Sequence, residues 1–464
     1  MLGVGVYFMR KNQSDDDYYV GGRNMSAVHI GLSVVATDVG GGFSIGLGGL
    51  GFLMGLSGSW MLFTGLLGAW LSAVFLIPRV YEISRLNKLL TFPEALRHFY
   101  NPKVALAAAI ISMIGYVGFT SSQILAGAKL ASATFPSVPI NTAVYIMGII
   151  AVLYTAVGGI KAVIYTDTIQ WSILMIVLVF IGIPLGYNAI GGRTAIVEVL
   201  DRSYLQLSNV SWVQLLNWSI TIIPIWFVGM TLYQRIYACR DEKTAIRAWR
   251  LAGLFEWPIM AFMGIALGLF ARVAFEQGVF AELGYPATAE IDAELGLPLF
   301  LRHILPIGLM GVMMSAYFSA ILSTADSCLM AASGNFTTDI APYFKSLRNK
   351  GVRTSQIVTG LVGITSVLLA SHMQNVLELM LYSYAFMVSG LFVPVLAMIV
   401  HQDPSHRAAL GAMVVGGTTT LVLILSGVSL PLDLDANIFG VSASMLTYLV
   451  LNRMDHRTQI PHHG

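Results

Sequence analysis

The stretch ATDVGGGFSIGLGGLGF, from Ala36 to Phe52, contains a single acid, Asp38, and three consecutive glycines at 40–42. Each glycine weakens a helix by roughly 1 kcal/mol relative to alanine, so the triple glycine predicts a break in an otherwise apolar helix. Irregular backbone inside a membrane persists only where protein or a water-filled cavity surrounds it. The carbonyl oxygens of an unwound turn are suitable ligands for a hard cation such as Na⁺. Gly46 and Gly49 instead indicate close packing between helices.

The whole chain has the composition of a membrane protein. Its 464 residues are 56% hydrophobic and 11% charged, whereas soluble domains carry about 25% charged residues. Twelve apolar runs have roughly the length that a helix needs to cross a bilayer. They cover residues 27–52, 57–78, 104–128, 138–158, 164–188, 213–235, 249–275, 306–333, 355–371, 375–400, 408–426 and 434–452. With residues 1–9 interpreted as the end of a truncated first helix, the sequence predicts an all-α polytopic membrane protein with about 13 transmembrane helices.

Charge placement predicts the orientation of these helices. The basic residues between the apolar runs gather on one side of the predicted membrane, and Arg235 is counted among them. The loop at 276–297 lies on the other side and is rich in acids. The positive-inside rule then places the N-terminus outside and the C-terminus in the cytoplasm. We expect the location to be a bacterial inner (plasma) membrane.

Several classes of protein are disfavoured. A net charge of +2 is too small to indicate a nucleic-acid partner, and the two cysteines, Cys239 and Cys328, exclude a disulfide framework. The sequence contains neither a G-x-x-x-x-G-K-[ST] phosphate loop nor an H-E-x-x-H motif. The loops are too short for a catalytic domain, so we do not expect an enzyme.

A second interrupted helix follows five spans after the first. In SITIIPIWFVGMTLYQR, from Ser219 to Arg235, Pro224 and Gly229 both disfavour a continuous helix. Paired broken helices at matching positions are typical of transporters built from two inverted repeats, so the spacing predicts a five-plus-five repeat.

The eighth full span adds oxygen ligands. In SAYFSAILSTADSCLMAASGNF, residues 315–336, the positions of Ala320, Ser323 and Thr324 share one helix face. A carbonyl group and two hydroxyl groups on one face would supply part of the oxygen shell of a cation site. The alternative is that each hydroxyl bonds to the carbonyl one turn earlier in its own helix.

Four motifs carry a resemblance that extends over essentially the whole chain. They are DDYYVGGR at 16–23, GGIKAVIYTDTIQ at 158–170, YQR at 233–235 and SAILSTADS at 319–327. In this order they resemble the sodium:solute symporter family, which has a LeuT-like fold. The resemblance implies that 27–400 is a ten-helix inverted-repeat transport core. Residues 1–26 would then be the truncated first helix and a cytoplasmic entry loop, and 401–464 would be two accessory helices and a cytoplasmic tail.

The resemblance also implies the ion ligands. Carbonyl groups of Ala36, Val39 and Ala320 and the hydroxyl groups of Ser323 and Thr324 would bind Na⁺. Asp38 matches an acid that is important for sodium in proline-symporter-like members, and other members have a neutral residue there. A second ion site or ion path is implied for Asp38, Asp167, Asp326 and Ser327, although Asp326 replaces a residue that is often serine.

Solute contacts are expected from position near the middle of the membrane. These positions are Phe43, Ser44, Trp60, Gln123, Trp226, Phe227 and Tyr384. Their aromatic rings would suit a quaternary ammonium group, and ordinary packing is the alternative for each. The sequence leaves the solute and the oligomeric state open.

The expected function is Na⁺-driven symport of a small polar organic solute across the lipid bilayer by alternating access. One alternative is an H⁺-coupled symporter that uses Asp38 or Asp167 as the proton carrier. The other is a non-transporting solute sensor or a channel-like membrane protein.

Overall fold

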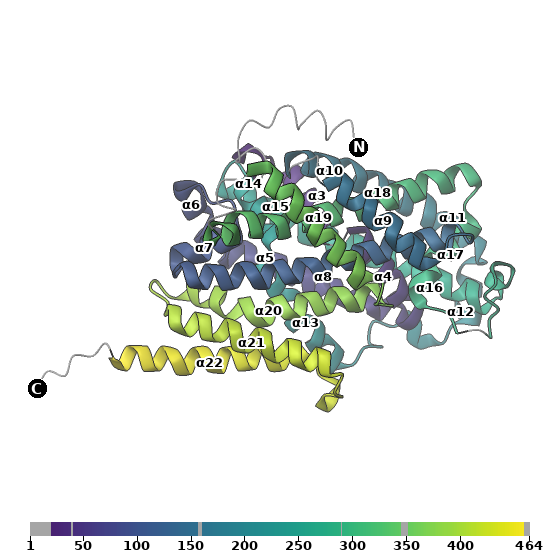
Figure 1. Cartoon of the computed structure of the whole chain (residues 1–464). Helices are drawn as coiled ribbons and strands as arrows, with labels where there is room; N and C mark the ends of the chain where they lie inside the picture. Colours follow the sequence, from purple (N-terminus) through teal and green to yellow (C-terminus); the bar gives the residue numbers. More distant parts are fainter. Residues whose placement is uncertain (1–19, 39, 156–159, 289, 345–350, 459–464) are drawn as a thin grey trace, which may run out of the picture.

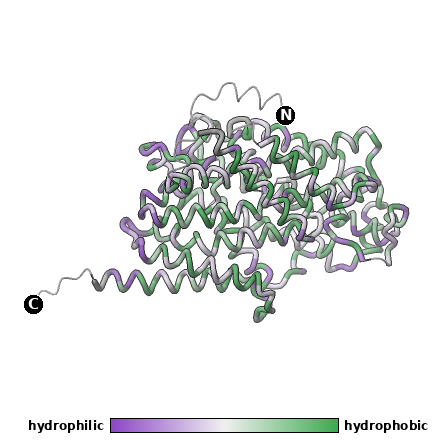
Figure 2. The backbone as a smooth tube through the Cα atoms, in the orientation of Figure 1, coloured by the Kyte–Doolittle hydropathy of each residue, from purple (hydrophilic) through white to green (hydrophobic). Residues whose placement is uncertain are grey.

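The computed structural model describes residues 20–38, 40–155, 160–288, 290–344 and 351–458, and within these ranges the chain is almost entirely helical. Long helices run side by side in one bundle (Figure 1). Hydrophobic residues dominate these helices, whereas hydrophilic residues gather mainly in loops near their ends (Figure 2). This distribution suits helices that lie in hydrocarbon and end in water. The truncated helix predicted at 1–9 lies outside the described residues.

The helices follow the predicted apolar runs closely. The first half contains α3 (Ala27–Asp38), α4 (Gly40–Met54), α5 (Trp60–Phe75), α6 (Ile77–Asn87), α7 (Phe92–Phe99), α8 (Pro102–Thr134), α9 (Ile140–Thr155), α10 (Ile160–Val177), α11 (Ile183–Ala189) and α12 (Gly192–Val199). The second half contains α13 (Trp212–Val228), α14 (Met230–Ala238), α15 (Glu242–Phe255), α16 (Phe262–Glu276), α17 (Ala293–Ile304), α18 (Ile307–Gly334), α19 (Gly351–Ala370), α20 (Val376–Val400), α21 (His406–Ser426) and α22 (Ala436–Thr458).

Fewer helices have the length and composition of a membrane span than the sequence predicts. Among the described residues, seven helical segments are long and apolar enough to cross a membrane, or eight if the bent pair α13–α14 is one span. The helices α3, α9 and α19 fall among shorter apolar segments, and α22 is not one of the seven. The all-α polytopic architecture is therefore confirmed, and the count of 13 is not.

The predicted break in the first span separates α3 from α4. Helix α3 ends at Asp38, and α4 begins at Gly40, whose φ of +36° favours glycine. A Cβ atom at Gly40 would also overlap the Thr324 hydroxyl group of α18. Glycine therefore allows the broken backbone to approach α18 directly. Val39 lies outside the described residues.

The second predicted break separates α13 from α14. The two helices meet at Gly229 with a bend of 44°, and Pro224 lies inside α13. Gly229 has extended backbone, yet its N–H still donates to the Ile225 carbonyl at 2.9 Å. The chain thus changes direction here while this backbone hydrogen bond is kept.

Packing surrounds the first broken helix with other elements. Helix α3 packs against α10, α15 and α18, whereas α4 packs against α16 and α17. Gly46 and Gly49 make close approaches to Leu377 and Glu294, as the sequence predicts. Helices α21 and α22 pack together and against α20 at one side of the bundle (Figure 1).

Candidate functional site

A buried ion pair joins α10 to α14. Asp167 and Arg235 are both fully buried, and Arg235 Nη2 lies 3.2 Å from Asp167 Oδ2. The hydroxyl group of Ser33 on α3 donates to Asp167 Oδ2 at 2.6 Å and accepts from Arg235 Nε at 3.0 Å. Hydrogen bonds of this kind offset the large cost of removing two charges from water. The pair therefore ties three helices together.

The burial of Arg235 corrects its assignment as a surface charge beside the membrane. Its Nη2 also donates to Thr37 Oγ1 at 2.5 Å and to Ser327 Oγ at 3.1 Å. The guanidinium group thus lies between Asp167 and Ser327, two of the residues expected at a second ion site or ion path. In this conformation the positive charge beside Asp167 comes from the protein itself.

The hydroxyl group of Thr324 links α18 to the end of α3. It lies 3.0 Å from the Ala36 carbonyl oxygen and 3.1 Å from the Ala320 carbonyl oxygen, with good geometry to donate to either. Three of the expected Na⁺ ligands, one hydroxyl and two carbonyl groups, are therefore brought together. The Ala320 carbonyl lies one turn earlier in the same helix, where threonine hydroxyl groups commonly bond. The Ala36 carbonyl, in contrast, belongs to the broken helix α3.

Ser323 points to a different neighbour from Thr324. Its hydroxyl group donates to Asp167 Oδ1, the carboxylate oxygen that Arg235 does not contact. The structure therefore separates the two hydroxyl groups that were expected to face α3 together. Ser323 connects α18 to α10, so the candidate ion ligands and the buried ion pair form one continuous polar network.

Asp326 belongs to a separate contact. Its carboxylate accepts a hydrogen bond of 2.5 Å from Thr155 Oγ1 on α9, and it is 2% exposed. The structure does not bring it to the hydroxyl group of Thr324. Its hydrogen bond with Thr155 links α18 to α9.

Asp38 is the last residue of α3 and lies at the break before α4. It is buried, and the Tyr384 hydroxyl group of α20 donates to its Oδ1 at 3.4 Å. A second buried acid, Glu256, begins the turn between α15 and α16 and is 1% exposed. Charged groups inside a membrane protein are expensive and mark functional sites by default.

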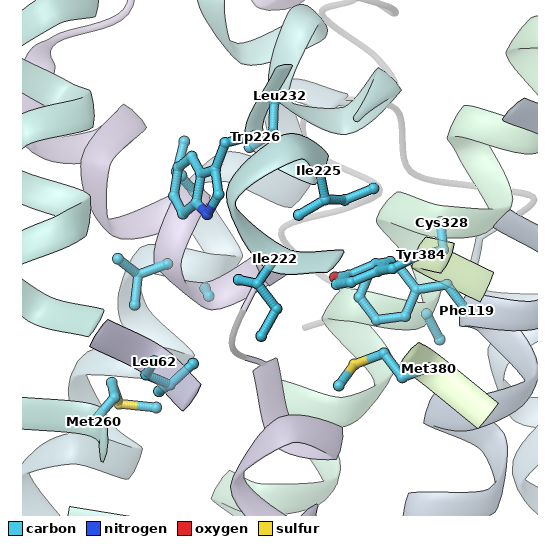
Figure 3. Close-up of a cluster of buried hydrophobic side chains, with 14 of the residues drawn as sticks. Leu62, Phe119, Ile222, Ile225, Trp226, Leu232, Met260, Cys328, Met380 and Tyr384 are labelled. Carbon is cyan, nitrogen blue, oxygen red and sulfur yellow. The ribbon is translucent and has the colours of Figure 1, made fainter. Parts of the chain in front are cut away.

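The residues expected at the solute divide into separate groups. Tyr384 packs against Phe119 at a ring distance of 5.0 Å, and Figure 3 shows both rings facing Ile225 and Met380. Trp226 projects from the other side of α13 and packs against Trp249 at 6.4 Å (Figure 3). The structure therefore does not bring Trp226 to Tyr384.

The remaining solute positions contact other neighbours. Phe227 packs against Phe392 at 5.8 Å, and the Trp60 indole donates to the Leu207 carbonyl in a loop. The Ser44 hydroxyl donates to the Gly40 carbonyl at 3.0 Å, where it supports the first turn of α4. The Gln123 amide donates to Ser122 Oγ at 3.3 Å. The side chain of Phe43 lies outside the described part of the chain.

A cavity of about 750 Å³ opens near the start of α20. Helix α4, the first part of α13 and the segment before α17 line it, and Ala385 brings it to the residue after Tyr384. Its lining includes four acids, Asp292, Glu294, Glu378 and Asp435. Glu294 pairs with the buried Lys129 Nζ at 2.6 Å and accepts from the Val376 and Leu377 amides.

Sequence reasoning missed two charged residues of the interior and misplaced a third. Glu256 lies inside the apolar run 249–275, Lys129 directly follows the run 104–128, and a charge at such a position is itself the signal that should have singled them out. Arg235 was noticed, but its position at the end of an apolar run is equally typical of a cytoplasmic anchor.

Secondary transporters typically contain broken helices beside a polar network, within a bundle of membrane-length helices. The model of the sodium:solute symporter family matches residues 18–416, and the chain belongs to this family. It is therefore a Na⁺-driven symporter and not an enzyme.

Two curated relatives illustrate the match. The sodium/proline symporter of Salmonella typhimurium is 26% identical over 438 residues, which cover 91% of this chain and 85% of that protein. The sodium/sialic acid symporter NanT of Aliivibrio fischeri is 25% identical over 490 residues, covering 97% and 89%.

A solved structure supports the fold. The substrate-bound, outward-open Na⁺-coupled sialic acid symporter superposes with a TM-score of 0.79 at 21% identity, covering 98% of this chain and 95% of that one. The likeness confirms that the whole chain has the fold of a known membrane transporter.

Proposed function

We propose that the chain carries a small polar organic solute across a bacterial inner membrane by alternating access, with Na⁺ bound between the end of α3 and α18. The observation that carries this proposal is the Thr324 hydroxyl group, which lies 3.0–3.1 Å from the carbonyl oxygens of Ala36 and Ala320. Hard cations prefer such oxygen ligands. The carbonyl of Val39 would join this shell, and Ser323 would join it on releasing Asp167, its partner in this structure.

Sodium binding at this position would join the broken helix to α18. Because Thr324 belongs to one element and Ala36 to the other, an ion that binds both favours the conformation in which they meet. The solute would favour the same conformation from the Tyr384 side of the break. Each ligand would then strengthen the binding of the other, as linkage requires.

The wider arrangement also remains our proposal. Residues 27–400 would form the inverted-repeat core, with the two broken helices at equivalent positions, and 401–464 the accessory part. The acidic cavity beside α17 and α20 would face outward, because the positive-inside rule would place the basic loops in the cytoplasm. The N-terminus would lie outside and the C-terminus inside.

Vesicles test the coupling directly. Proline and sialic acid are the first solutes to examine, because sodium/proline and sodium/sialic acid symporters are relatives; other amino acids, sugars, carboxylates and quaternary amines follow. We expect an inward Na⁺ gradient to drive accumulation and a pH gradient alone to drive none. Accumulation driven equally by either gradient would contradict Na⁺ coupling, and solute flux without accumulation would indicate a channel.

A further inference from the structure

The segment before α3 and the segment after α14 are joined by a short parallel β-bridge between Met25 and Cys239. The Met25 N–H donates to the Ala238 carbonyl at 2.9 Å, and the Arg240 N–H donates to the Met25 carbonyl at 3.3 Å. Helix α3 is the first half of one broken helix, and α14 is the second half of the other. The bridge therefore connects the two broken helices at the ends that lie farthest from their breaks.

One arginine side chain, that of Arg85 on α6, holds both segments of this bridge. Its Nη2 donates to three backbone carbonyl oxygens, those of Arg23 at 2.9 Å, Cys239 at 3.1 Å and Arg240 at 2.5 Å. Its Nε donates to the Tyr81 hydroxyl group at 2.9 Å, and that hydroxyl group donates to the Cys239 carbonyl at 3.2 Å. Hydrogen bonds from a charged donor are roughly twice as strong as those between neutral groups. Arg85 thus clamps the chain on both sides of the bridge.

A second arginine makes the reciprocal contact. Arg23 is buried and belongs to the segment before α3. Its guanidinium group donates to the Leu89 carbonyl at 2.8 Å and to the Ser84 carbonyl at 3.3 Å, at the end of α6. Each segment therefore supplies an arginine to the carbonyl groups of the other, so separation of α3 from α6 would break both sets of hydrogen bonds.

The clamp and the acidic cavity lie at opposite ends of the bundle. Arg79 on α6 donates to the carbonyl groups of Met398 and His401, where α20 ends. The cavity opens at the start of α20, and a helix of 25 residues is about 37 Å long. Figure 1 likewise shows α6 and α7 at one end of the bundle and α17 at the other. The structure is therefore open at one end and clamped at the other.

Helix α3 connects the clamp to the proposed Na⁺ site. It begins at Ala27, two residues after Met25, and ends beside the Ala36 carbonyl that contacts Thr324 of α18. A helix of 12 residues moves largely as a rigid unit, so displacement of its start also displaces the Ala36 carbonyl.

We propose that Arg85 is a positioning residue: by clamping the Met25–Cys239 bridge, it keeps the transporter closed at the end opposite the acidic cavity while Na⁺ binds. This inference rests on the proposed function only for the Na⁺ site between α3 and α18. Release of the clamp would let the start of α3 separate from α14 and would withdraw Ala36 from Thr324. Bound Na⁺ and a closed clamp would then each favour the other, as linkage requires.

The chain contains its own reporter for this movement. Cys239 is fully buried at the bridge, and Cys328 is fully buried on α18. The purified full chain in lipid nanodiscs is treated with N-ethylmaleimide, with saturating Na⁺ or with K⁺ at matched ionic strength, and mass spectrometry measures the labelling rate of each cysteine. The variants are Arg85→Gln and Arg79→Gln, which removes two contacts between α6 and backbone carbonyl groups that lie away from the bridge.

We expect Na⁺ to slow the labelling of Cys239 in the wild type and in Arg79→Gln. In Arg85→Gln with Na⁺, Cys239 should react about tenfold faster than in the wild type, equivalent to about 1.4 kcal/mol of lost closure. An unchanged rate at Cys239 would overturn the proposal, as would an equal rise at Cys328, which would indicate general loosening. If Arg85→Gln accelerates labelling but Na⁺ has no effect on the wild type, the clamp stands and the proposed Na⁺ site fails.

A disulfide bond can replace the clamp. Neighbouring strands lie about 4.8 Å apart, within the reach of a disulfide, so Met25→Cys should cross-link to Cys239 on oxidation with copper phenanthroline. Arg85→Gln should raise the half-saturating Na⁺ concentration about tenfold, measured by Na⁺-dependent thermal stabilisation. In Met25→Cys/Arg85→Gln, oxidation should restore the wild-type value and reduction should abolish the recovery. A complete cross-link that leaves Na⁺ affinity low would contradict the role of Arg85.

Discussion

Replacement of Thr324 by alanine removes the hydroxyl group that joins α18 to α3. In the structure this group is fully buried and lies 3.0 Å from the carbonyl oxygen of Ala36 and 3.1 Å from that of Ala320. Loss of one buried polar contact costs about 1–3 kcal/mol. If the contact contributes to the Na⁺ shell, the half-saturating Na⁺ concentration should rise about five- to 150-fold.

Three replacements separate the hydroxyl group from the shape of the side chain. Thr324→Ser keeps the hydroxyl group and should change Na⁺ affinity little. Thr324→Val keeps the shape but exchanges the hydroxyl group for a methyl group, so it should resemble alanine. A packing role predicts the opposite order, with valine mild and serine costly because of its lost methyl group.

The assay is Na⁺-dependent thermal stabilisation of the purified protein, with K⁺ at matched ionic strength as the control. It needs no knowledge of the solute, because an ion that binds only the folded state raises the midpoint of unfolding. Normal Na⁺ titrations in both Thr324→Ala and Thr324→Val would refute the assignment of Thr324 as a ligand.

Three further predictions concern other buried contacts. Asp167→Asn leaves the Arg235 guanidinium group without its counter-charge and should reduce the free energy of unfolding by about 3–5 kcal/mol. In chemical unfolding, the double variant Asp167→Asn/Arg235→Gln should recover much of that loss. An equal loss in the single and the double variant would exclude a coupled pair. Gly40→Ala introduces about 1–2 kcal/mol of backbone strain, and its methyl group would overlap the Thr324 hydroxyl group on α18. The half-saturating Na⁺ concentration should therefore rise at least about fivefold. An unchanged Na⁺ titration would show that the break is not part of the site. Lys129→Met leaves Glu294 buried without its cation and should lower the thermal midpoint clearly, with partial recovery on adding Glu294→Gln; an unaffected midpoint would show that the ion pair contributes nothing.

The breaks in the helices were predictable from the sequence because their cause is local. Three glycines cannot hold an ordinary helical turn firmly, and Pro224 with Gly229 removes the continuity of another helix. These features need no knowledge of the neighbouring helices. The sequence therefore predicts where the backbone is irregular, and the structure places breaks at both positions.

The partners of the buried charges were not predictable in the same way. Arg235 and Asp167 are 68 residues apart, and Ser33 reaches Asp167 only because α3 packs against α10. A single sequence gives the period of an apolar face but not the rotation of one helix against another. For this reason Thr324 could be assigned to α3 by its helix face, whereas its neighbour Ser323 turned out to bond to α10.

The Asp167–Arg235 ion pair has an electrical consequence. Moving one elementary charge through the membrane potential changes the energy by about 2.3 kcal/mol per 100 mV. An intact pair has no net charge, so displacement of the pair as a unit performs almost no work against the membrane potential. The sensitivity of the transport cycle to voltage must then arise from the ions in transit and from acids without a basic neighbour. A fully buried arginine thus leaves the centre of the polar network without net charge.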